Sequence, residues 1–401
     1  MSTTTLALVD HFADIPDPRR EHCKLHLLQD ILTIALCAVI AGANTWEQIE
    51  TFGKAKRDWL SGFLALPHGI PSHDTFRRVF AALRPAAFAD AFVGWMNAAC
   101  DACGLRRIHI DGKSWRGSRR QTKGGLCPAL HLVSAWAGAN HLTLGQVAVD
   151  GKSNEITAIP KLLDLLDVKG CIVTIDAIGC QTDIAAQIVA GGGDYVLAVK
   201  ENQPTLFADI EALVHTAVDT DFAGLDHDLF STEEQGHGRQ ERRTYLAIYD
   251  PPGLRTADSW EGLKAVIVVT RERSVGDKDS LEQHFYISSA AVREQAWAEV
   301  IRGHWGIENN LHWVLDVVFR EDDSRTRDVN AACNLALLRK IALSLLKQVP
   351  DKGSLFDKRL HAGWDNAYLE KILGPLANEG PKQAAPRATP PSPDLHPLTP
   401  R

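Results

Sequence analysis

Several features that mark particular protein classes are missing from this sequence. The longest apolar run, residues 31–43, is too short to cross a bilayer, so we expect no membrane partner. The opening residues MSTTTLALVDHF carry an early acid and no basic segment, so we expect no secretory signal and a cytoplasmic protein. The 8 cysteines show neither a disulfide framework nor the spacing of a zinc site, which is typical of a reducing compartment.

An excess of positive charge is also missing. The chain carries 43 Lys and Arg residues against 50 Asp and Glu residues, a net charge of −7. Proteins that bind nucleic acids usually have a basic footprint, so the overall composition argues against that class. The argument weakens where basic residues cluster, and in this sequence several of them do.

The 401 residues are enough for two or three packed units, of which the first is helical. Apolar periodicity predicts an all-helical N-terminal domain over residues 1–100. One of its helices, DTFRRVFAAL, can be capped by Ser72 or Asp74. Arg77 and Arg78 on this helix would bind repeat DNA if the segment is a helix-turn-helix. A helical bundle with a solvated charged face is the alternative.

From about residue 105 the pattern changes to strands. Predicted strands cover RRIHIDGK, LHLVSAWAG and HLTLGQVAV, and the strands CIVTID and DYVLAVK then alternate with helices. This element order predicts an α/β fold with a mixed sheet, as in the ribonuclease H-like fold. We assign residues 101–350 to this domain, with a β-rich insertion at 205–290. A helical extension at 351–373 precedes a tail at 374–401, which holds 8 of the 19 prolines and is expected to be disordered.

Two aspartates follow predicted strands. Asp111 ends the first strand, and Asp176 ends CIVTID. In a sheet of this order the two strands are neighbours, so both carboxylates should lie near the same edge. An acid at the end of an apolar strand is costly unless it is paired or bound to a metal. The alternative is that each aspartate simply caps a turn.

A polar stripe on a later helix offers a third acid. His304, Glu308, His312 and Asp316 recur at four-residue intervals, so they share one helix face. Histidines eight residues apart lie about 12 Å apart along the axis, too far to bind one zinc ion together. We predict that Glu308 faces the two aspartates, with Asp316 as its main rival. A salt-bridged helix without a metal is the structural alternative.

Three converging carboxylates are hard oxygen ligands, which Mg²⁺ and Mn²⁺ prefer. Two such ions would activate a water or a 3′-hydroxyl for in-line phosphoryl transfer. Two basic clusters are candidates for binding DNA phosphates, although the first could be a solvated loop and the second is interrupted by Glu241. They comprise Lys113, Arg116, Arg119, Arg120 and Lys123, and then Arg239, Arg242 and Arg243. Trp260 is a candidate for stacking on an extruded base, with burial in the core as the alternative.

These segments together resemble the bacterial insertion-sequence DDE transposases, in the H-repeat-associated branch. The resemblance extends to about residue 373 and is carried by HIDGKSWRGS, TIDAIGCQTDIA, DYVLAVKENQPTL, GHGRQERR and HWGIENNLHWVLDVVFREDDSR. It implies Mg²⁺- or Mn²⁺-dependent cleavage at terminal inverted repeats and 3′-OH strand transfer into target DNA. It also implies that Asp111, Asp176 and Glu308 are the catalytic, metal-binding triad. Double-stranded DNA would be the partner of a homodimer or larger synaptic complex.

The chain departs from the broader signature of Tyr, Arg, Glu and Lys on the catalytic helix of such enzymes. Ile301, His304 and Leu315 stand where the Tyr, Arg and Lys would be, and Glu308 keeps its place. His304 and His312 could replace part of the phosphate binding, especially when protonated. Two other functions stay open at this point. One is a degenerate element protein that binds DNA without cutting it, and the other is a ribonuclease H-like nuclease without strand transfer.

Overall fold

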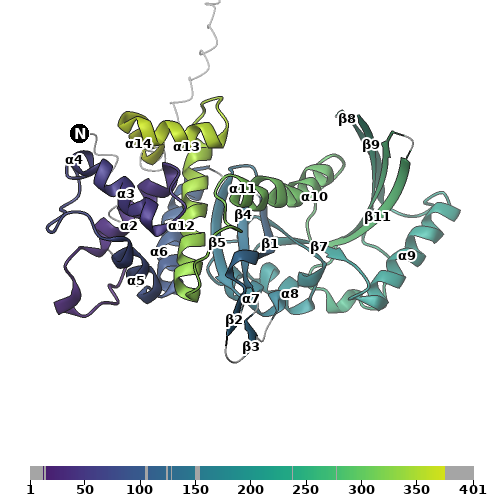
Figure 1. Ribbon diagram of the computed structural model, residues 1–401. Coiled ribbons are helices and arrows are strands. Elements are labelled where there is room, and N and C mark those ends of the chain that lie inside the picture. Colours follow the sequence, from purple (N-terminus) through teal and green to yellow (C-terminus); the bar gives the residue numbers. More distant parts are fainter. Residues whose placement is uncertain are drawn as a thin grey trace, which may run out of the picture.

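The structure is a computed structural model that describes residue 12 and residues 15–103, 107–122, 125–127, 129–149, 154–236, 238–276 and 278–374. Lys123 and the Pro-rich tail from residue 375 therefore lie outside the described residues. Figure 1 shows one large sheet with helices on both faces and a group of helices at one end. The predicted mixed α/β class is confirmed.

The described elements that precede the first strand are all helical. They are η1 (Glu21–Cys23), α2 (Leu28–Ile40), α3 (Trp46–Ala55), α4 (Arg57–Leu60), α5 (His73–Ala82) and α6 (Pro85–Cys103). Helix α5 begins after Ser72, whose side-chain oxygen accepts a hydrogen bond from the backbone N–H of Thr75, so the predicted cap is confirmed. Phe76 and Phe80 are buried on one side of α5, and Arg77 and Arg78 are exposed on the other.

A nine-stranded sheet in the order β5-β4-β1-β6-β7-β11-β10-β9-β8 lies at the centre of the described chain. Its first five members are β5 (Leu142–Ala148), β4 (Leu130–Ala137), β1 (Arg107–Trp115), β6 (Ile172–Ile175) and β7 (Asp194–Val199). Strand β1 pairs antiparallel with β4 and parallel with β6, and β6 pairs parallel with β7. The sheet is therefore mixed, and the strands that carry the two candidate aspartates are neighbours, as predicted.

The first strand is longer than predicted, because β1 continues to Trp115 along β4. Its pairing with β6 is shorter and ends where Ile110 meets Ile175. Asp111 and Asp176 are the next residues on the two chains. Asp111 thus lies inside one strand pairing and just beyond the other, so its carboxylate reaches the edge that Asp176 occupies.

The predicted insertion extends the same sheet. After α9 (Pro204–Asp219), the strands β8 (His227–Gly236), β9 (Arg239–Tyr249), β10 (Ala265–Val275) and β11 (Lys278–Ser288) form an antiparallel group that joins β7 through β11. Three strands were predicted here, and β8 was missed because its sequence, HDLFSTEEQG, is mostly polar. It is an edge strand with one solvated face, which explains this composition. Trp260, in the same region, is 3% exposed and belongs to the core.

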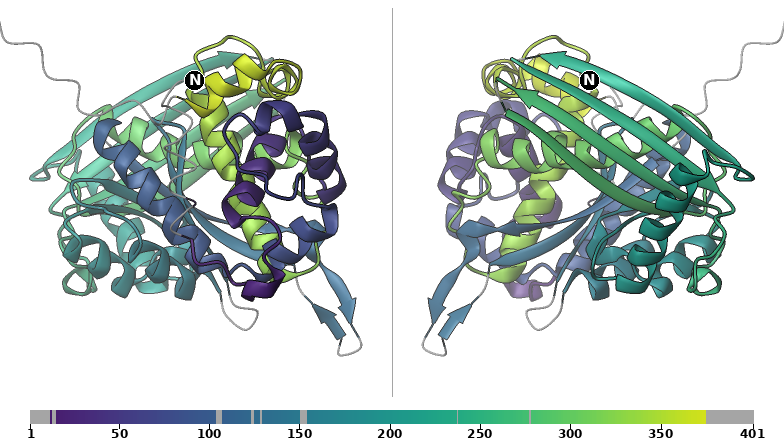
Figure 2. Two further views of the ribbon diagram at one scale, coloured as in Figure 1. Left: turned by 90° about the vertical axis from the view of Figure 1, so that its left-hand side faces the viewer. Right: turned by 90° about the vertical axis from the view of Figure 1, so that its right-hand side faces the viewer.

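Helices α7 (Glu155–Leu163) and α8 (Thr182–Ala190) cover one face of the sheet, together with the short turn η3 (Ala177–Gly179) at its edge. The other face carries α10 (Ala296–Ile307), the π-helical segment η5 (Glu308–His312) and α11 (Trp313–Val317) (Figure 1). A small hairpin of β2 (Arg120–Thr122) and β3 (Gly125–Cys127) follows η2 (Arg116–Ser118). Figure 2 shows this hairpin projecting from the body.

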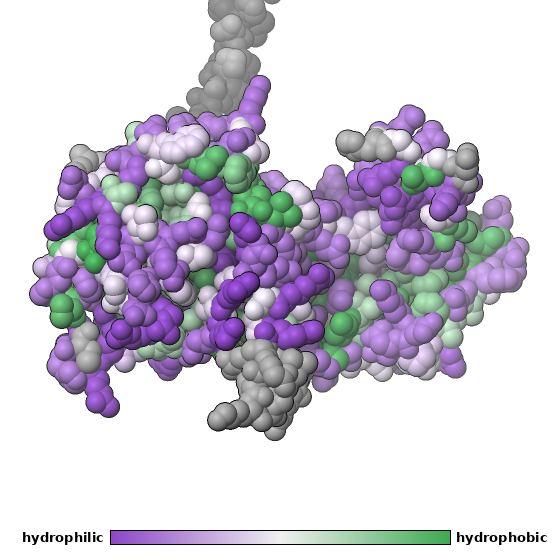
Figure 3. All heavy atoms as spheres, in the orientation of Figure 1, coloured by the Kyte–Doolittle hydropathy of each residue, from purple (hydrophilic) through white to green (hydrophobic). Residues whose placement is uncertain are grey.

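Helix α12 (Val329–Gln348) connects the two parts of the fold. It packs against α2 and α5 on one side and against β4 and β5 on the other, and α13 (Leu355–Trp364) and α14 (Asn366–Leu373) complete the helical group. By length and composition α12 could cross a membrane, yet 89% of its apolar window is buried inside the structure. In the orientation of Figure 1 the surface is mostly hydrophilic (Figure 3). We therefore interpret α12 as a core helix.

Candidate active site

Asp111, Asp176 and Glu308 line one pocket of about 290 Å³. Asp111 comes from β1, Asp176 from the end of β6, and Glu308 from the start of η5, so segments almost 200 residues apart supply them. Burial raises the pKa of Asp111 to about 7, and the charges of Asp176, Glu155 and Glu308 add to the effect. The pocket therefore gathers several carboxylates that repel one another.

Asp176 has a second, structural contact. Its Oδ1 accepts a hydrogen bond from the backbone N–H of Gly179 at 3.4 Å and so caps η3. Burial and the charge of Glu155 nevertheless raise the pKa of Asp176. The alternative of a simple turn cap thus describes part of what Asp176 does, since the residue both caps η3 and contributes to the acidic pocket.

The donor set fits a hard divalent cation in charge and in chemistry. Among the described residues that line the pocket, Lys200 is the one with a fixed positive charge, so three acids face a single permanent cation. Carboxylate oxygens are the ligands that Mg²⁺ and Mn²⁺ prefer. In the described part of the chain, however, no three His, Cys, Asp or Glu side chains stand close enough together to hold one ion. A bound ion would have to draw the carboxylates closer than they lie here.

The polar stripe predicted over His304, Glu308, His312 and Asp316 meets the sheet along β1, but the helix that carries it is not a regular α-helix throughout. An α-helix runs to Ile307, η5 then makes a wider π turn from Glu308 to His312, and α11 continues. Such a turn changes the direction of the side chains that follow it. His312 Nδ1 consequently lies 3.4 Å from Asp111 Oδ2, and Asp316 Oδ1 lies 2.5 Å from Lys113 Nζ.

Alternate residues of β1 face this helix. His109 Nδ1 lies 2.7 Å from Thr174 Oγ1, which in turn lies 2.9 Å from His304 Nδ1. Helix α10 can approach His109 this closely because residue 303 is glycine, where a Cβ would stand only 2.7 Å from the His109 ring. His109, Asp111 and Lys113 share one strand face. They lie against Gly303, His312 and Asp316 of the helical segment, respectively.

Lys113 is not available to DNA in this arrangement. Its side chain is 13% exposed, and its ammonium group pairs with Asp316 and, at 2.7 Å, with the buried Glu321. Burial opposes the charge of Lys113, but Glu321 and Asp316 outweigh it and raise the pKa of the lysine. The prediction that Lys113 binds phosphate is therefore not supported, and Asp316 is occupied by a lysine and does not line the acidic pocket.

The sequence of the chain matches a known protein family over the region that forms this site. The family described as "Transposase DDE domain" matches residues 103–345, which include β1, β6 and the helical segment α10–η5–α11. The chain belongs to the DDE transposase family. A "DDE_Tnp_1-associated" region matches residues 9–96.

Relatives of this DDE transposase resemble it over most of its length. It is 41% identical over 379 residues to the "Putative transposase YncI" of Escherichia coli O157:H7, with 93% of this chain and 96% of that protein covered. It is 39% identical over 374 residues to the "H repeat-associated putative transposase YhhI" of Escherichia coli K12, with 91% and 97% covered. A piggyBac transposase synaptic complex with hairpin DNA aligns with a TM-score of 0.38 at 13% identity, over 97% of this chain and 86% of the other.

The other basic residues predicted to contact DNA fall on separate parts of the transposase. Arg116 and Arg119 are exposed beside the β2–β3 hairpin, and Arg239 and Arg242 are exposed on β9. The side chain of Arg120 lies outside the described residues. Arg243 is buried and pairs with Glu241, so the acid that interrupts this basic run holds one of its arginines.

The two histidines expected to assist in phosphate binding are held neutral. Burial lowers the pKa of His304 to about 4. Burial, reinforced by the charges of Lys340 and Lys113, lowers the pKa of His312 to about 3. Near pH 7 the positive charge that we expected of these histidines on protonation is therefore not available. His312 instead contacts the carboxylate of Asp111.

Sequence reasoning missed other residues that line the acidic pocket, among them Lys200, His284 and Trp305. Lys200 directly follows β7, the strand next to β6, so the argument that paired Asp111 with Asp176 could also have found it. Trp305 lies 5.5 Å from the Arg243 guanidinium and 5.7 Å from that of Arg271, measured from the ring centre. These arginines come from β9 and β10, and no local signal in the sequence connects them to Trp305.

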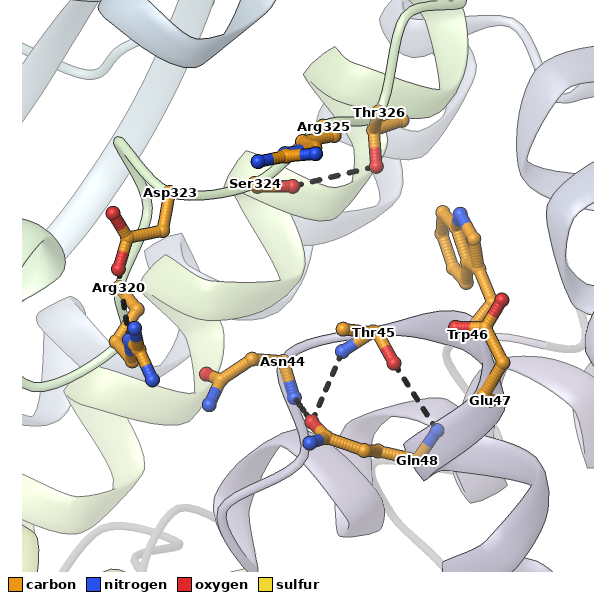
Figure 4. A pocket seen from close by; sticks show the side chains of 10 residues that line it. All are labelled: Asn44, Thr45, Trp46, Glu47, Gln48, Arg320, Asp323, Ser324, Arg325 and Thr326. Carbon is orange, nitrogen blue, oxygen red and sulfur yellow. Dashed lines mark hydrogen bonds and ion pairs between the residues drawn. The ribbon is translucent and has the colours of Figure 1, made fainter.

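A second pocket, of about 450 Å³, is separate from the acidic one. It lies between the start of α3 and the loop after α11, and the lining residues drawn in Figure 4 come from these two segments. Arg320 on the loop extends toward the capped N-terminus of α3, where Thr45 and Gln48 bond to each other's backbone, and Arg325 lies along the loop beside Ser324. Arg320 is already paired with Asp323 at 2.8 Å, and Glu47 adds a further acid. The lining therefore carries no excess of positive charge.

The stability of the transposase should depend on pH through His109. Burial, with the charges of His304 and Arg107, lowers the pKa of His109 to about 3 from 6.5. Below pH 6.5 the unfolded chain takes up a proton that the native state refuses, so stability falls as the pH drops. Between pH 7 and 5 one such residue costs about 2 kcal/mol. We therefore expect the free energy of unfolding of His109→Gln to fall by about 2 kcal/mol less than that of wild type between pH 7 and pH 5. Urea unfolding at the two pH values measures this difference.

His22→Gln, at an exposed position of η1, is the control variant and should show the acid sensitivity of wild type. An unchanged acid sensitivity in His109→Gln would show that His109 is not the buried neutral base described here.

Proposed function

We propose that this chain is a DNA transposase that cleaves phosphodiester bonds at the terminal inverted repeats of its own insertion sequence. It then joins the 3′-OH to target DNA. The observation that carries the proposal is that Asp111, Asp176 and Glu308, from two neighbouring strands and one helix, line a single pocket. The strand order β5-β4-β1-β6-β7, with β4 antiparallel, supports a ribonuclease H-like core at residues 101–350.

The three acids have the role of binding Mg²⁺ or Mn²⁺. Bound ions would supply activation of a water or a 3′-hydroxyl and stabilise the leaving oxygen. The chain itself orients the groups that hold them. His312 Nδ1 lies beside the carboxylate of Asp111, and the π turn of η5 brings Glu308 and His312 to the same end of β1. Lys200 offers a positive charge inside the pocket that suits a phosphate oxygen.

Double-stranded DNA, of the terminal repeats and of the target, is the partner in this proposal. Figure 3 shows the surface hollowed between the free ends of β8–β11 and the C-terminal helices, with α10 below the hollow as in Figure 1. Arg239 and Arg242 lie toward the free ends of these strands, and Arg116 and Arg119 lie beside the hairpin. Exposed arginines of this kind bind phosphates without reading sequence.

Recognition of the repeats is assigned to the N-terminal helices, with Arg77 and Arg78 on α5 as contacts. Both arginines are exposed, and both lie near Asp74, to which Arg77 donates at 2.8 Å. Binding of a phosphate would compete with this surface ion pair, which contributes little to stability. We place the reaction in the cytoplasm, in a homodimer or larger synaptic complex that holds two transposon ends.

The test is cleavage of a labelled duplex that carries the terminal repeat. Wild type should cut at the repeat boundary with Mg²⁺ and not with EDTA. Asp176→Asn should bind the duplex and fail to cut it, because the substitution removes a carboxylate and preserves size. Asp183→Asn, which removes an exposed acid from the first turn of α8, is the control and should cut normally. Binding without cutting by wild type would favour the degenerate element protein, and cutting without strand transfer would favour a simple nuclease.

A further inference from the structure

A fourth acid, Glu155, lies beside the candidate triad. It is the first residue of α7, on the face of the sheet opposite α10 (Figure 1). Its side chain is 12% exposed. A Cβ placed on Gly112 would stand 2.2 Å from Glu155 Oε1, so the carboxylate touches the backbone of the residue that follows Asp111. Glycine at position 112 is what allows this approach.

Two side chains of neighbouring strands fix the position of Glu155. His131 Nε2 lies 2.6 Å from Glu155 Oε1, and His131 Nδ1 lies 2.8 Å from Ser114 Oγ. Ser114 and His131 are directly opposite each other in the β1–β4 pairing. The carboxylate of Glu155 is therefore held by a side chain of β4, which is in turn held by Ser114 of β1, the strand that carries Asp111.

Glu155 also lies near the second strand of the site. Its charge acts on both Asp111 and Asp176, and among the charges that act on Asp176 it has the largest effect. The pairing of β1 with β6 ends at Ile110 and Ile175, so Asp111, Asp176 and the Gly112 that Glu155 contacts all lie just beyond it. Burying Glu155 beside two other acids costs stability, because the three carboxylates repel one another. A contact with His131 alone would not require Glu155 to lie at this position.

We propose that Glu155 is a fourth carboxylate of the catalytic centre, acting on the divalent cations from the face of the sheet opposite Glu308. The inference rests on the proposed function. Two divalent ions carry four positive charges, and the triad supplies three negative ones. Mg²⁺ is commonly bound by one or two carboxylates together with water and substrate phosphate. With Glu155 included, the centre has four carboxylates, which is two for each of two ions.

The experiment compares Mn²⁺ binding by the full chain and its Glu155→Gln variant, measured by calorimetry and by the electron spin resonance signal of free Mn²⁺. The amide keeps the size of the side chain and can still bond to His131, so a purely structural role predicts unchanged binding. We expect at least about tenfold weaker binding or the loss of one ion per chain. Asp183→Asn is the control, and it should bind Mn²⁺ as wild type does.

Thermal unfolding gives a second readout that a structural role would not produce. Without metal, Glu155→Gln should unfold at a higher temperature than wild type, because one of several repelling charges is removed. Addition of Mn²⁺ should raise the unfolding temperature of Glu155→Gln by less than it raises that of wild type. The inference would be overturned if Glu155→Gln bound Mn²⁺ as wild type does, or if Mn²⁺ raised the unfolding temperatures of both proteins equally.

The outcomes also separate this inference from the proposed function. Asp111→Asn should lose Mn²⁺ binding whatever Glu155 does. If Asp111→Asn loses binding and Glu155→Gln retains it, the triad stands and the fourth carboxylate is wrong. If wild type neither binds Mn²⁺ nor cuts the repeat duplex, both proposals fail.

Discussion

Glu308→Gln is expected to slow cleavage of a terminal-repeat duplex on the order of a thousand-fold, with little change in stability. Glu308 lies on the exposed side of η5 and lines the acidic pocket. The substitution therefore removes a charge from the proposed metal centre without opening the core. Single-turnover cleavage with Mg²⁺, at enzyme concentrations that saturate the duplex, separates this loss from weaker DNA binding.

Asp316→Asn is the matched comparison, because sequence reasoning left Asp316 as the rival of Glu308. Its carboxylate pairs with Lys113 and is absent from the described lining of the acidic pocket. Lys113 retains Glu321 as a partner in this variant, so we expect the rate to fall by less than about tenfold. Full loss of cleavage in Asp316→Asn together with normal cleavage in Glu308→Gln would reverse the assignment of the helix.

The largest effect on stability is expected from Glu321→Gln. Glu321 is 2% exposed, and its two oxygens lie 2.7 Å from Lys113 Nζ and 3.9 Å from Arg339 Nη1. Burial opposes its ionisation, but the charges of Lys113 and Arg339 outweigh that effect and lower the pKa of Glu321. The amide would leave the guanidinium of the 1% exposed Arg339 without this carboxylate, against the ring of Trp115.

Removing one partner of a buried ion pair costs about 3–5 kcal/mol, and this is the loss we expect in urea unfolding of Glu321→Gln. Asp323→Asn is the control two residues away. It breaks the exposed pair with Arg320 and should cost less than about 1 kcal/mol. Equal losses in the two variants would mean that the buried network around Glu321 contributes no more than a surface ion pair.

Much of the site could be predicted from local patterns. Alternating apolar residues defined the strands, and their order made neighbours of those that carry Asp111 and Asp176. The four-residue spacing of polar side chains found the helix that meets them. The π turn at Glu308–His312 could not be predicted from this spacing, because a single wide turn produces no repeating pattern in the sequence.

The remaining differences come from long-range contacts. Lys113 stands among basic residues in the sequence, so it was predicted to contact DNA, but Glu321 and Asp316 approach it from a helix and loop about 200 residues later. Glu155 was not considered, because a lone acid in the first turn of a helix is ordinary. Its importance depends on the absence of a side chain at Gly112, which only the packing of α7 against β4 and β5 and the contact of Glu155 with Gly112 reveal.

The position of α12 has a consequence for the order of events during synthesis. Residues 329–348 fill the space between α2 and α5 on one side and β4 and β5 on the other, and they emerge from the ribosome after both. Until then the nascent chain carries the apolar faces that α12 will cover. Lys340, on the same helix, donates to Ser134 and Gln146, so its arrival also satisfies polar groups of β4 and β5. A ribosome that stops before residue 329 would release a polypeptide with all four acids and no completed core. The fold thus completes the core between the N-terminal helices and the sheet that carries Asp111 only after residue 348 has been synthesised.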